Sequence, residues 1–209
     1  MFRVTFAKIK LSMSITPTIV YAEATPNPNT MKFVANRLII EPNKIVEYLN
    51  ESECEGAPLA KELFKGGYVK SLFFNNNFIS ITKTDVQEWN RLVSPVREFL
   101  QDYFTKALPV IEVYPEPKEK NQESNTVLIP TEGSVEEAII NILEEYIKPA
   151  VEQDGGAISF RSFNEGIVTV ALQGSCSGCP SSKVTLKSGI ENLLKRMLPE
   201  VKEVVAEEL

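Results

Sequence analysis

Two cysteines three residues apart are the side chains of this sequence best suited to chemistry. Cys176 and Cys179 lie in the stretch QGSCSGCPSS, residues 173–182, between a predicted strand and a predicted helix. At this spacing both sulfurs can be directed at one metal ion. Gly174 and Gly178 allow the backbone to turn tightly and to approach a ligand closely. A helix that begins just beyond Cys179 would favour thiolate over thiol and soften the negative charge of a bound cluster.

Taken alone, the CxxC spacing has three interpretations: an iron-sulfur cluster, a zinc site or dithiol redox chemistry. A structural zinc site or a cuboidal cluster generally takes four protein ligands. The chain offers two neighbouring cysteines, the distant Cys54 and no histidine. One chain therefore cannot fill the shell, whereas two chains that pair their CxxC loops supply four thiolates. A cluster held at such an interface by few contacts can leave, which is the property that a carrier needs.

Two alternatives use the same loop. The main rival is a zinc-binding interaction module. The enzyme-class alternative is a thiol-disulfide oxidoreductase, although such an enzyme does not need a loop so rich in glycine and serine. Visible colour separates an iron-sulfur protein from a zinc-binding module, because an iron-sulfur cluster absorbs visible light and zinc does not.

Two other features are given structural interpretations. Cys54 lies among Glu51, Glu53 and Glu55, where neighbouring negative charge disfavours the thiolate. We therefore expect an ordinary surface or helix-end cysteine. The Asp-Gly-Gly sequence at residues 154–156 is interpreted as a helix C-terminus that turns into a strand, rather than as a carboxylate ligand.

The composition excludes several classes of protein. Without histidine the chain has no Ser-His-Asp triad, no Cys-His nucleophile pair and no histidine metal ligand. A net charge of −6 argues against nucleic acid as the main partner. No apolar stretch is long enough to span a bilayer, so we expect no membrane partner. Three cysteines with one close pair suit a reducing compartment rather than a disulfide framework.

The chain divides into two predicted domains. We expect a disordered tail or weak targeting leader over residues 1–18, a first domain over 19–113, a linker over 114–130 and a second domain over 131–209. The linker is predicted from its prolines, mixed charge and amide-rich polar residues. Each domain has the size of an independent small fold.

The first domain is predicted to alternate strands with helices. Strands are expected at residues 19–25, 31–40, 69–74 and 78–82, a short helix at 57–65, and a helical pattern from Asp85 to about Ala107. Pro95 is predicted to open a second helix within that pattern. Trp89 and the Phe73-Phe74 pair are interpreted as core residues rather than the lining of a groove.

The second domain is predicted to have the order α-β-β-α-β. Ser134 and Glu137 have capping-box spacing at the start of an amphipathic helix. A hairpin is expected from residues 157–163 and 167–172, then a helix from Pro180 to about Leu198, and a third strand at 201–206. The apolar residues predicted to face inward from the second helix are Val184, Leu186, Ile190, Leu193, Leu194 and Met197. The fold class is therefore α+β, with two small domains that each have a small mixed sheet and helices packed on one face.

The residues of both domains resemble those of a known family. The C-terminal stretches QDGGAISF and GIVTVALQGSCSGCPSSKVTLKSGIENLLKRMLPEV resemble the NifU-like domain of Nfu-type iron-sulfur scaffold and carrier proteins, with the DGG and GxCxGCPSS spacing intact. Upstream, YAEATPNPNTMKFVAN, APLAKELF and VKSLFFNNNFISITK resemble the Nfu N-terminal domain. The resemblance covers roughly residues 19–113 and 131–209. The stretch KGGYVKS departs from it, with two glycines and a tyrosine where more apolar residues are expected.

The resemblance implies a non-enzymatic function. It implies a [4Fe-4S] cluster bridged between two protomers by Cys176 and Cys179, with a [2Fe-2S] cluster as the alternative form. Upstream assembly proteins would supply the cluster and apo iron-sulfur proteins would receive it, with the N-terminal domain assisting partner recognition. The family occurs in bacteria and mitochondria. Because Arg3, Lys8 and Lys10 form a short and sparsely charged leader, a bacterial cytoplasm is favoured, with the mitochondrial matrix as the alternative.

Overall fold

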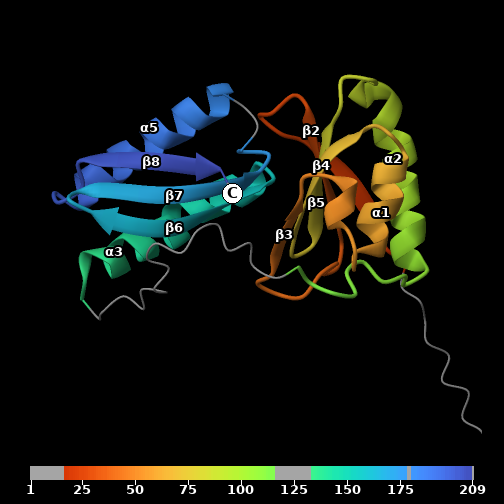
Figure 1. Ribbon diagram of the computed structural model, residues 1–209, viewed down its shortest axis with the longest axis horizontal. Coiled ribbons are helices and arrows are strands. Elements are labelled where there is room, and N and C mark those ends of the chain that lie inside the picture. Colours follow the sequence, from red (N-terminus) through yellow and green to blue (C-terminus); the bar gives the residue numbers. More distant parts are fainter. Residues whose placement is uncertain (1–16, 116–132, 178–179, 209) are drawn as a thin grey trace, which may run out of the picture.

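The computed structural model describes residues 17–115, 133–177 and 180–208. They form two α+β domains joined side by side, each built around its own sheet (Figure 1). The fold class is thus as predicted. The limits of the domains at 19–113 and 131–209 remain predictions, because most of the tail at 1–18 and of the linker at 114–130 lies outside the described residues.

The N-terminal domain is built on a five-stranded sheet in the order β1-β2-β5-β4-β3. The strands are β1 (Val20–Ala24), β2 (Thr30–Ala35), β3 (Ile45–Tyr48), β4 (Val69–Asn75) and β5 (Phe78–Lys83). Every neighbouring pair is antiparallel, so the mixed sheet predicted for this domain is wrong in that detail. The four predicted strands are present, although the one expected over residues 31–40 ends at Ala35, and they pair as β1-β2 and β4-β5. Strand β3 was not predicted.

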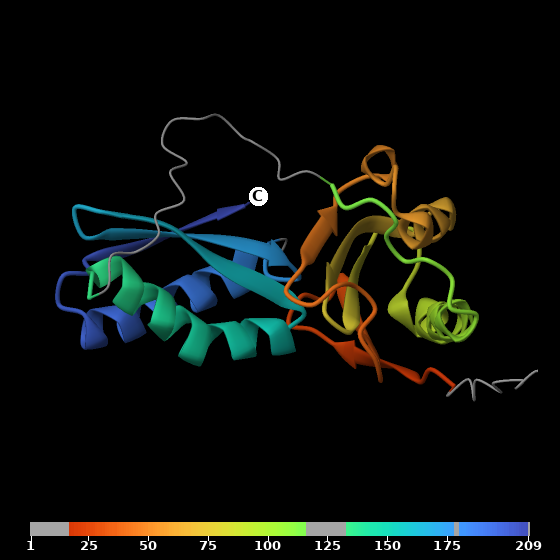
Figure 2. The same ribbon diagram turned by 90° about the horizontal axis from the view of Figure 1, so that it is seen from below.

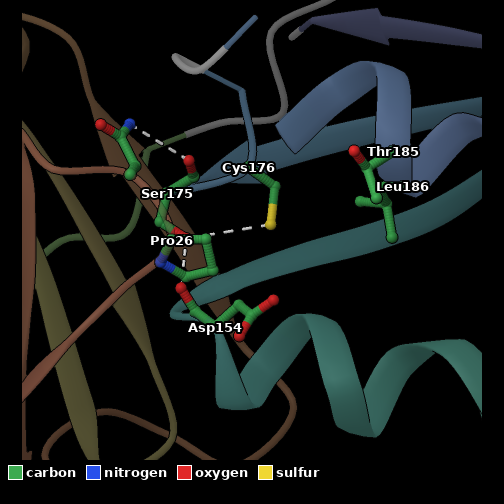
Figure 3. Close-up of a pocket in the computed structure, with 7 residues that line it drawn as sticks. Pro26, Asp154, Ser175, Cys176, Thr185 and Leu186 are labelled. Carbon is green, nitrogen blue, oxygen red and sulfur yellow. Dashed lines mark hydrogen bonds between the residues drawn. The ribbon is translucent and has the colours of Figure 1, made fainter. Parts of the chain in front are cut away.

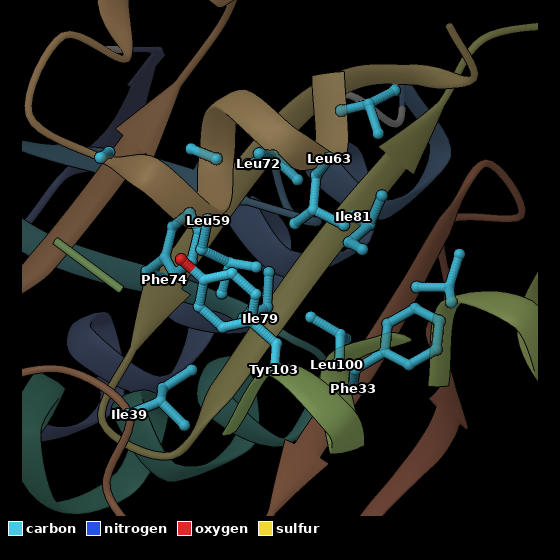
Figure 4. Packing of buried hydrophobic residues seen from close by; sticks show 14 of the residues in the cluster. Phe33, Ile39, Leu59, Leu63, Leu72, Phe74, Ile79, Ile81, Leu100 and Tyr103 are labelled. Atoms are coloured by element: carbon cyan, nitrogen blue, oxygen red, sulfur yellow. The ribbon is translucent and has the colours of Figure 1, made fainter. Parts of the chain in front are cut away.

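One face of this sheet is covered by helices. They are α1 (Pro58–Lys65) and α2 (Trp89–Thr105), with a short 3-10 turn, η1 (Glu51–Glu53). Alternate residues of the strands point to this face, and Phe33, Phe74 and Ile79 meet Leu59 and Leu100 of the helices in one apolar core (Figure 4). The remaining strand positions, such as Lys32, Phe73 and Ser80, point to the opposite face.

Helix α2 differs from the prediction in two respects. It begins after Glu88 rather than at Asp85, and it runs unbroken through Pro95. Proline in a helix interior leaves one backbone carbonyl without its usual N–H partner. Pro95 is exposed, so water can reach that carbonyl, and burial of Leu92 and Val96 on the opposite side holds the helix together.

The C-terminal domain has the predicted order α-β-β-α-β. The first helical stretch consists of α3 (Val135–Ile142), a π-helical segment η2 (Leu143–Ile147) and α4 (Lys148–Gln153). Then follow β6 (Gly156–Asn164), β7 (Ile167–Gly174), α5 (Pro180–Met197) and β8 (Glu203–Glu208). The sheet order is β6-β7-β8, with β7 antiparallel to β6 and parallel to β8, so this sheet is mixed as predicted.

A local signal in the sequence accounts for the start of the first helix. Ser134 Oγ accepts a hydrogen bond from Glu137 N at 3.2 Å, which confirms the predicted cap of α3.

The helical stretch from α3 to α4 and the helix α5 both lie under one face of the sheet (Figure 2). Ile190 and Leu194 of α5 are fully buried there, but Val184 and Met197 are 68% and 43% exposed, so the prediction that these two face inward is wrong.

The domains meet through the face of the five-stranded sheet that α1 and α2 do not cover, which we call its outer face. The end of the three-stranded sheet that carries the cysteine loop abuts this face (Figures 1 and 2). Hydrogen bonds join residues more than 120 positions apart there, among them Asn27 to Ser175 and Glu47 to Gly174. Among the described residues, no helix is long and apolar enough to cross a membrane.

Candidate functional site

The cysteine loop follows directly from the central strand of the C-terminal sheet. Strand β7 ends at Gly174, whose φ of +69° lies in the left-handed region that favours glycine. Ser177 N and Ser177 Oγ both donate to Gly174 O, at 3.2 and 2.9 Å, which closes a tight turn around Cys176. Helix α5 then begins at Pro180, as predicted. The positive end of its dipole therefore lies a few residues from the Cys176 thiol, where it favours negative charge.

Cys176 is held close to the turn that precedes β6. Its side chain is buried, at 5% exposure, and Ser175 Oγ lies 3.8 Å from the Cys176 sulfur. Ser175 in turn donates through Oγ to Asp154 O and through its backbone N–H to Gly155 O. The cysteine loop and the Asp154-Gly155 turn are therefore one hydrogen-bonded unit.

The Asp-Gly-Gly sequence at 154–156 has the predicted structural role and a second one. It ends α4 and turns into β6, with Gly155 at φ +82°. It also packs directly against the cysteine. A β-carbon at Gly156 would lie 2.8 Å from the Cys176 sulfur, so only glycine leaves room for the sulfur there. The pKa of the Asp154 carboxyl is raised by burial, an effect that the positive charge of Lys32 opposes. The sequence interpretation found the turn and missed its contact with the cysteine.

A pocket of about 350 Å³ opens beside Cys176. It is lined by Pro26, Asn27, Asp154, Ser175, Cys176, Thr185 and Leu186. The Cys176 sulfur is directed into this pocket, with Leu186 of α5 across from it (Figure 3). Asn27 belongs to the other domain and reaches the loop by donating from Nδ2 to Ser175 O at 3.3 Å. The N-terminal domain thus supplies part of the wall.

Of the other two cysteines, the structure describes only Cys54. Cys179, the second predicted ligand, lies outside the described residues and stays a prediction. Cys54 is fully buried in the core of the N-terminal domain, so the predicted surface position is wrong, whereas the predicted helix-end position is confirmed, because Cys54 caps the C-terminus of η1. Burial, reinforced by Glu53 and Glu51, raises the pKa of the Cys54 thiol to about 11. Because Cys176 borders the core of the other domain, the two thiols do not share a site.

The described residues do not complete a metal site by themselves. Within residues 17–115, 133–177 and 180–208, no group of three or more histidine, cysteine, aspartate or glutamate side chains is placed to hold a metal ion. A cluster that takes four ligands would need donors in addition to Cys176.

Sequence reasoning also missed the contribution of the N-terminal domain to the site. Pro26 and Asn27 lie between two predicted strands, in the turn of the β1-β2 connection, where Asn29 N donates to Asn27 Oδ1 at 3.0 Å. A turn pattern carries no signal for what the turn will contact 148 positions further along the chain.

Comparisons with known proteins agree with this architecture. Residues 20–107 match the family model described as "Scaffold protein Nfu/NifU N terminal", and residues 139–205 match the one described as "NifU-like domain". The human protein named NFU1 iron-sulfur cluster scaffold homolog, mitochondrial, is 35% identical over 187 residues, which cover 88% of this chain and 70% of that protein. The Drosophila willistoni protein of the same name is 34% identical over 185 residues, which cover 88% of this chain and 62% of that protein.

Among solved structures, the solution structure of a NifU-like protein from Saccharomyces cerevisiae aligns with 53% of this chain and 98% of its own, at 19% identity and a TM-score of 0.40. That likeness is too low to add to the assignment. The two matched models define a two-domain protein in which an N-terminal α+β domain precedes a NifU-like domain. The chain belongs to the family of Nfu-type iron-sulfur cluster scaffold proteins.

Proposed function

We propose that this protein is a non-enzymatic iron-sulfur cluster scaffold and carrier. It binds a [4Fe-4S] cluster between two protomers through Cys176 and Cys179 and passes it to apo-proteins. The family membership supports the class of function. The observation that carries the site assignment is the direction of the Cys176 sulfur, which points into a pocket at the start of a helix (Figure 3).

The donor chemistry of the loop suits such a cluster. Thiolates are the usual ligands of iron-sulfur clusters, and the start of α5 places the positive end of a helix dipole near the negative charge that they bring. The chain has no histidine to offer instead. Two loops from two protomers give four thiolates, the number that either a [4Fe-4S] or a [2Fe-2S] cluster takes.

Delivery follows from thiol exchange on the cluster iron. A recipient thiolate forms a new iron–sulfur bond while the bond to Cys176 or Cys179 breaks, and the proton lost by the recipient thiol passes to the released cysteine. Iron and sulfide keep their oxidation states, so no external oxidant or reductant is needed. Apo iron-sulfur proteins are the recipients in this scheme, and upstream assembly proteins are the cluster donors.

The mitochondrial matrix becomes the favoured location over a bacterial cytoplasm. The human and Drosophila willistoni relatives both carry the word mitochondrial in their names. Uptake of the full chain by isolated mitochondria tests this, because a protein that stays outside would return the bacterial cytoplasm to first place.

Anaerobic reconstitution with iron and sulfide tests the function. We expect a coloured dimer with one cluster per two chains, seen by visible absorption, Mössbauer spectroscopy and molecular mass. Cys176→Ser and Cys179→Ser should each abolish the cluster and leave the circular dichroism spectrum unchanged, whereas Cys54→Ser should leave the cluster content intact. Full cluster retention in either loop variant would overturn the site. A colourless monomer that binds zinc would point to an interaction module.

A further inference from the structure

The outer face of the N-terminal sheet carries apolar side chains that its own domain does not cover. Val34, Phe73 and Phe78 are at most 5% exposed, yet they lie outside the core formed with α1 and α2. They form a separate small cluster with Ala157 of the C-terminal domain. Apolar residues gathered on the second face of a two-layer domain usually mark a contact surface.

Polar side chains of the same face are buried beside this cluster. Asn75 and Ser80 are 1% exposed and Lys32 is 8% exposed. Together with Asn27 and Glu47 they bind the backbone or side chains around the cysteine loop. The hydrogen bonds are Ser80 Oγ to Gly155 O at 2.6 Å, Asn27 Nδ2 to Ser175 O at 3.3 Å, Lys32 Nζ to Gln153 O at 3.2 Å, Asn75 Nδ2 to Glu152 Oε1 at 3.3 Å, and Gly174 N to Glu47 Oε1 at 3.1 Å.

These contacts depend on a close approach of the two domains. A β-carbon at Gly155 would lie 2.6 Å from Ser80 Oγ, and one at Gly174 would lie 2.8 Å from the Phe73 ring. Buried polar groups are stable only when they are hydrogen-bonded, so a partial separation of the surfaces would leave several of them without partners. The interface is therefore expected to be either fully made or fully parted.

The face contacts the two residues that precede the predicted ligand. Gly174 and Ser175 immediately precede Cys176 in the loop, and both hydrogen-bond across the interface. Pro26 and Asn27 close one side of the pocket into which the sulfur is directed. The Cys176 thiol is 5% exposed in this arrangement.

We propose that the outer face of the N-terminal sheet is a docking surface for the cysteine-loop end of the NifU-like domain, and that docking shields the Cys176 thiol until the domains part. The docking stands on the contacts described above, with Pro26 and Asn27 in the wall of the Cys176 pocket. Its consequence rests on the proposed function: a cluster shared by two loops requires each loop to be open to a second copy, so the domains must part before the cluster is loaded.

A charge change at Asn75 tests the docking. Asn75→Asp places a carboxylate against the carboxylate of Glu152, 3.3 Å away, and the repulsion acts only when the domains are docked. We expect the rate at which iodoacetamide alkylates Cys176, in reduced iron-free full-length protein, to rise by a factor of roughly 5–30. Tandem mass spectrometry, which fragments the shared peptide between Cys176 and Cys179, separates these two sites, and Cys54 lies on another peptide. Because no cluster is present, this result does not depend on whether the protein binds iron.

Three controls accompany this variant. Asn36→Asp adds the same charge at an exposed position whose Oδ1 accepts from Ile19 N, and it should leave the rate unchanged. Glu152→Gln added to Asn75→Asp restores a donor opposite the new carboxylate and should return the rate to near that of the parent protein. Cys54, fully buried in the N-terminal core, should stay slow to react and thereby report that this domain is folded.

An unchanged Cys176 rate in Asn75→Asp would overturn the proposal, as would an equal rise in Asn36→Asp. If Cys54 also becomes reactive, Ser80→Ala decides instead. It removes the 2.6 Å bond to Gly155 O without adding bulk or charge, and it should speed Cys176 alkylation by roughly fivefold. No acceleration in that variant would mean that the C-terminal domain alone buries the thiol.

Discussion

Gly156 faces the sulfur of Cys176 so closely that a β-carbon at residue 156 would lie 2.8 Å from Sγ and 2.6 Å from the carbonyl oxygen of Gln173. Carbon atoms do not come so near to either group, so Gly156→Ala must displace β7 or the cysteine loop. We expect the free energy of unfolding of the C-terminal domain to fall by about 1–3 kcal/mol. Reconstituted cluster should also pass to a chelator faster, as followed by visible absorption.

Gly189→Ala is the matched control for that substitution. Gly189 lies within α5, and the β-carbon that it would gain meets no atom within 4 Å apart from its chain neighbours and the nearby backbone of its own helix. Because alanine is the better helix former, this variant should be about 0.5–1 kcal/mol more stable. Equal effects of the two substitutions would show that the close approach of Gly156 to Cys176 is unimportant.

The buried thiol of Cys54 makes the stability of the N-terminal domain fall in alkaline solution. Its pKa is raised from 9.0 to about 11, chiefly by burial. The unfolded chain loses the proton first, so the stabilisation is fully present below pH 9 and is lost as the pH rises to 11. We expect a loss on the order of 1–2 kcal/mol in this window. Urea unfolding followed by fluorescence of Trp89, the single tryptophan, measures it.

Cys54→Ala should reduce this alkaline loss, and Cys176→Ala, in the other domain, should leave it unchanged. Part of the loss will persist, because burial also raises the pKa of Tyr48 to about 12 in the same core. An identical pH dependence in Cys54→Ala and the parent protein would contradict the assignment.

The cap of α3 makes a measurable contribution to stability. Ser134→Ala removes the acceptor for Glu137 N, and we expect a loss of about 1 kcal/mol in the unfolding of the C-terminal domain, measured by circular dichroism in urea. Ser134→Thr keeps the oxygen and should lose less. Equal losses in the two variants would mean that the hydroxyl does not act as a cap.

Pro95 should weaken α2 from within. Pro95→Ala supplies an N–H to the carbonyl of Arg91 at an exposed position, so the N-terminal domain should gain about 1–3 kcal/mol of stability. Unfolding in urea followed by Trp89 fluorescence measures this gain. The neighbouring change Ser94→Ala, also exposed, should alter stability by a few tenths of a kcal/mol. A loss of stability in Pro95→Ala would show that the ring is needed where it stands.

Local signals in the sequence predicted most of the elements. Alternating apolar residues and the cap at Ser134 locate most of the strands and the helices to within a few residues. Strand β3 was not predicted, because residues 45–48 form too short a run to show the alternation of apolar and polar side chains that marks a strand. The prediction of a second helix that starts at Pro95 was wrong, because proline more often opens a helix than lies inside one.

The parts that could not be predicted depend on contacts distant in the sequence. Glutamates beside Cys54 indicate a surface position, yet the thiol points inward while the carboxylates remain outside. Lys32 and Ser80 occupy the strand positions that alternation assigns to solvent, and they are buried by a domain that begins about a hundred residues after Lys32 and about fifty after Ser80. Alternation tells which residues share a face and says nothing about what covers it.

The outer face of the N-terminal sheet also has a consequence during synthesis of the chain, because its cover is made last. All five strands of this sheet precede residue 84, whereas its cover, the three-stranded sheet, is complete only when β8 pairs with β7. At roughly 5–20 residues per second, Phe73 and Phe78 are exposed on the ribosome for on the order of ten seconds. A nascent chain in that interval presents an aromatic patch to its neighbours, which makes it a natural client for chaperones that bind emerging polypeptides.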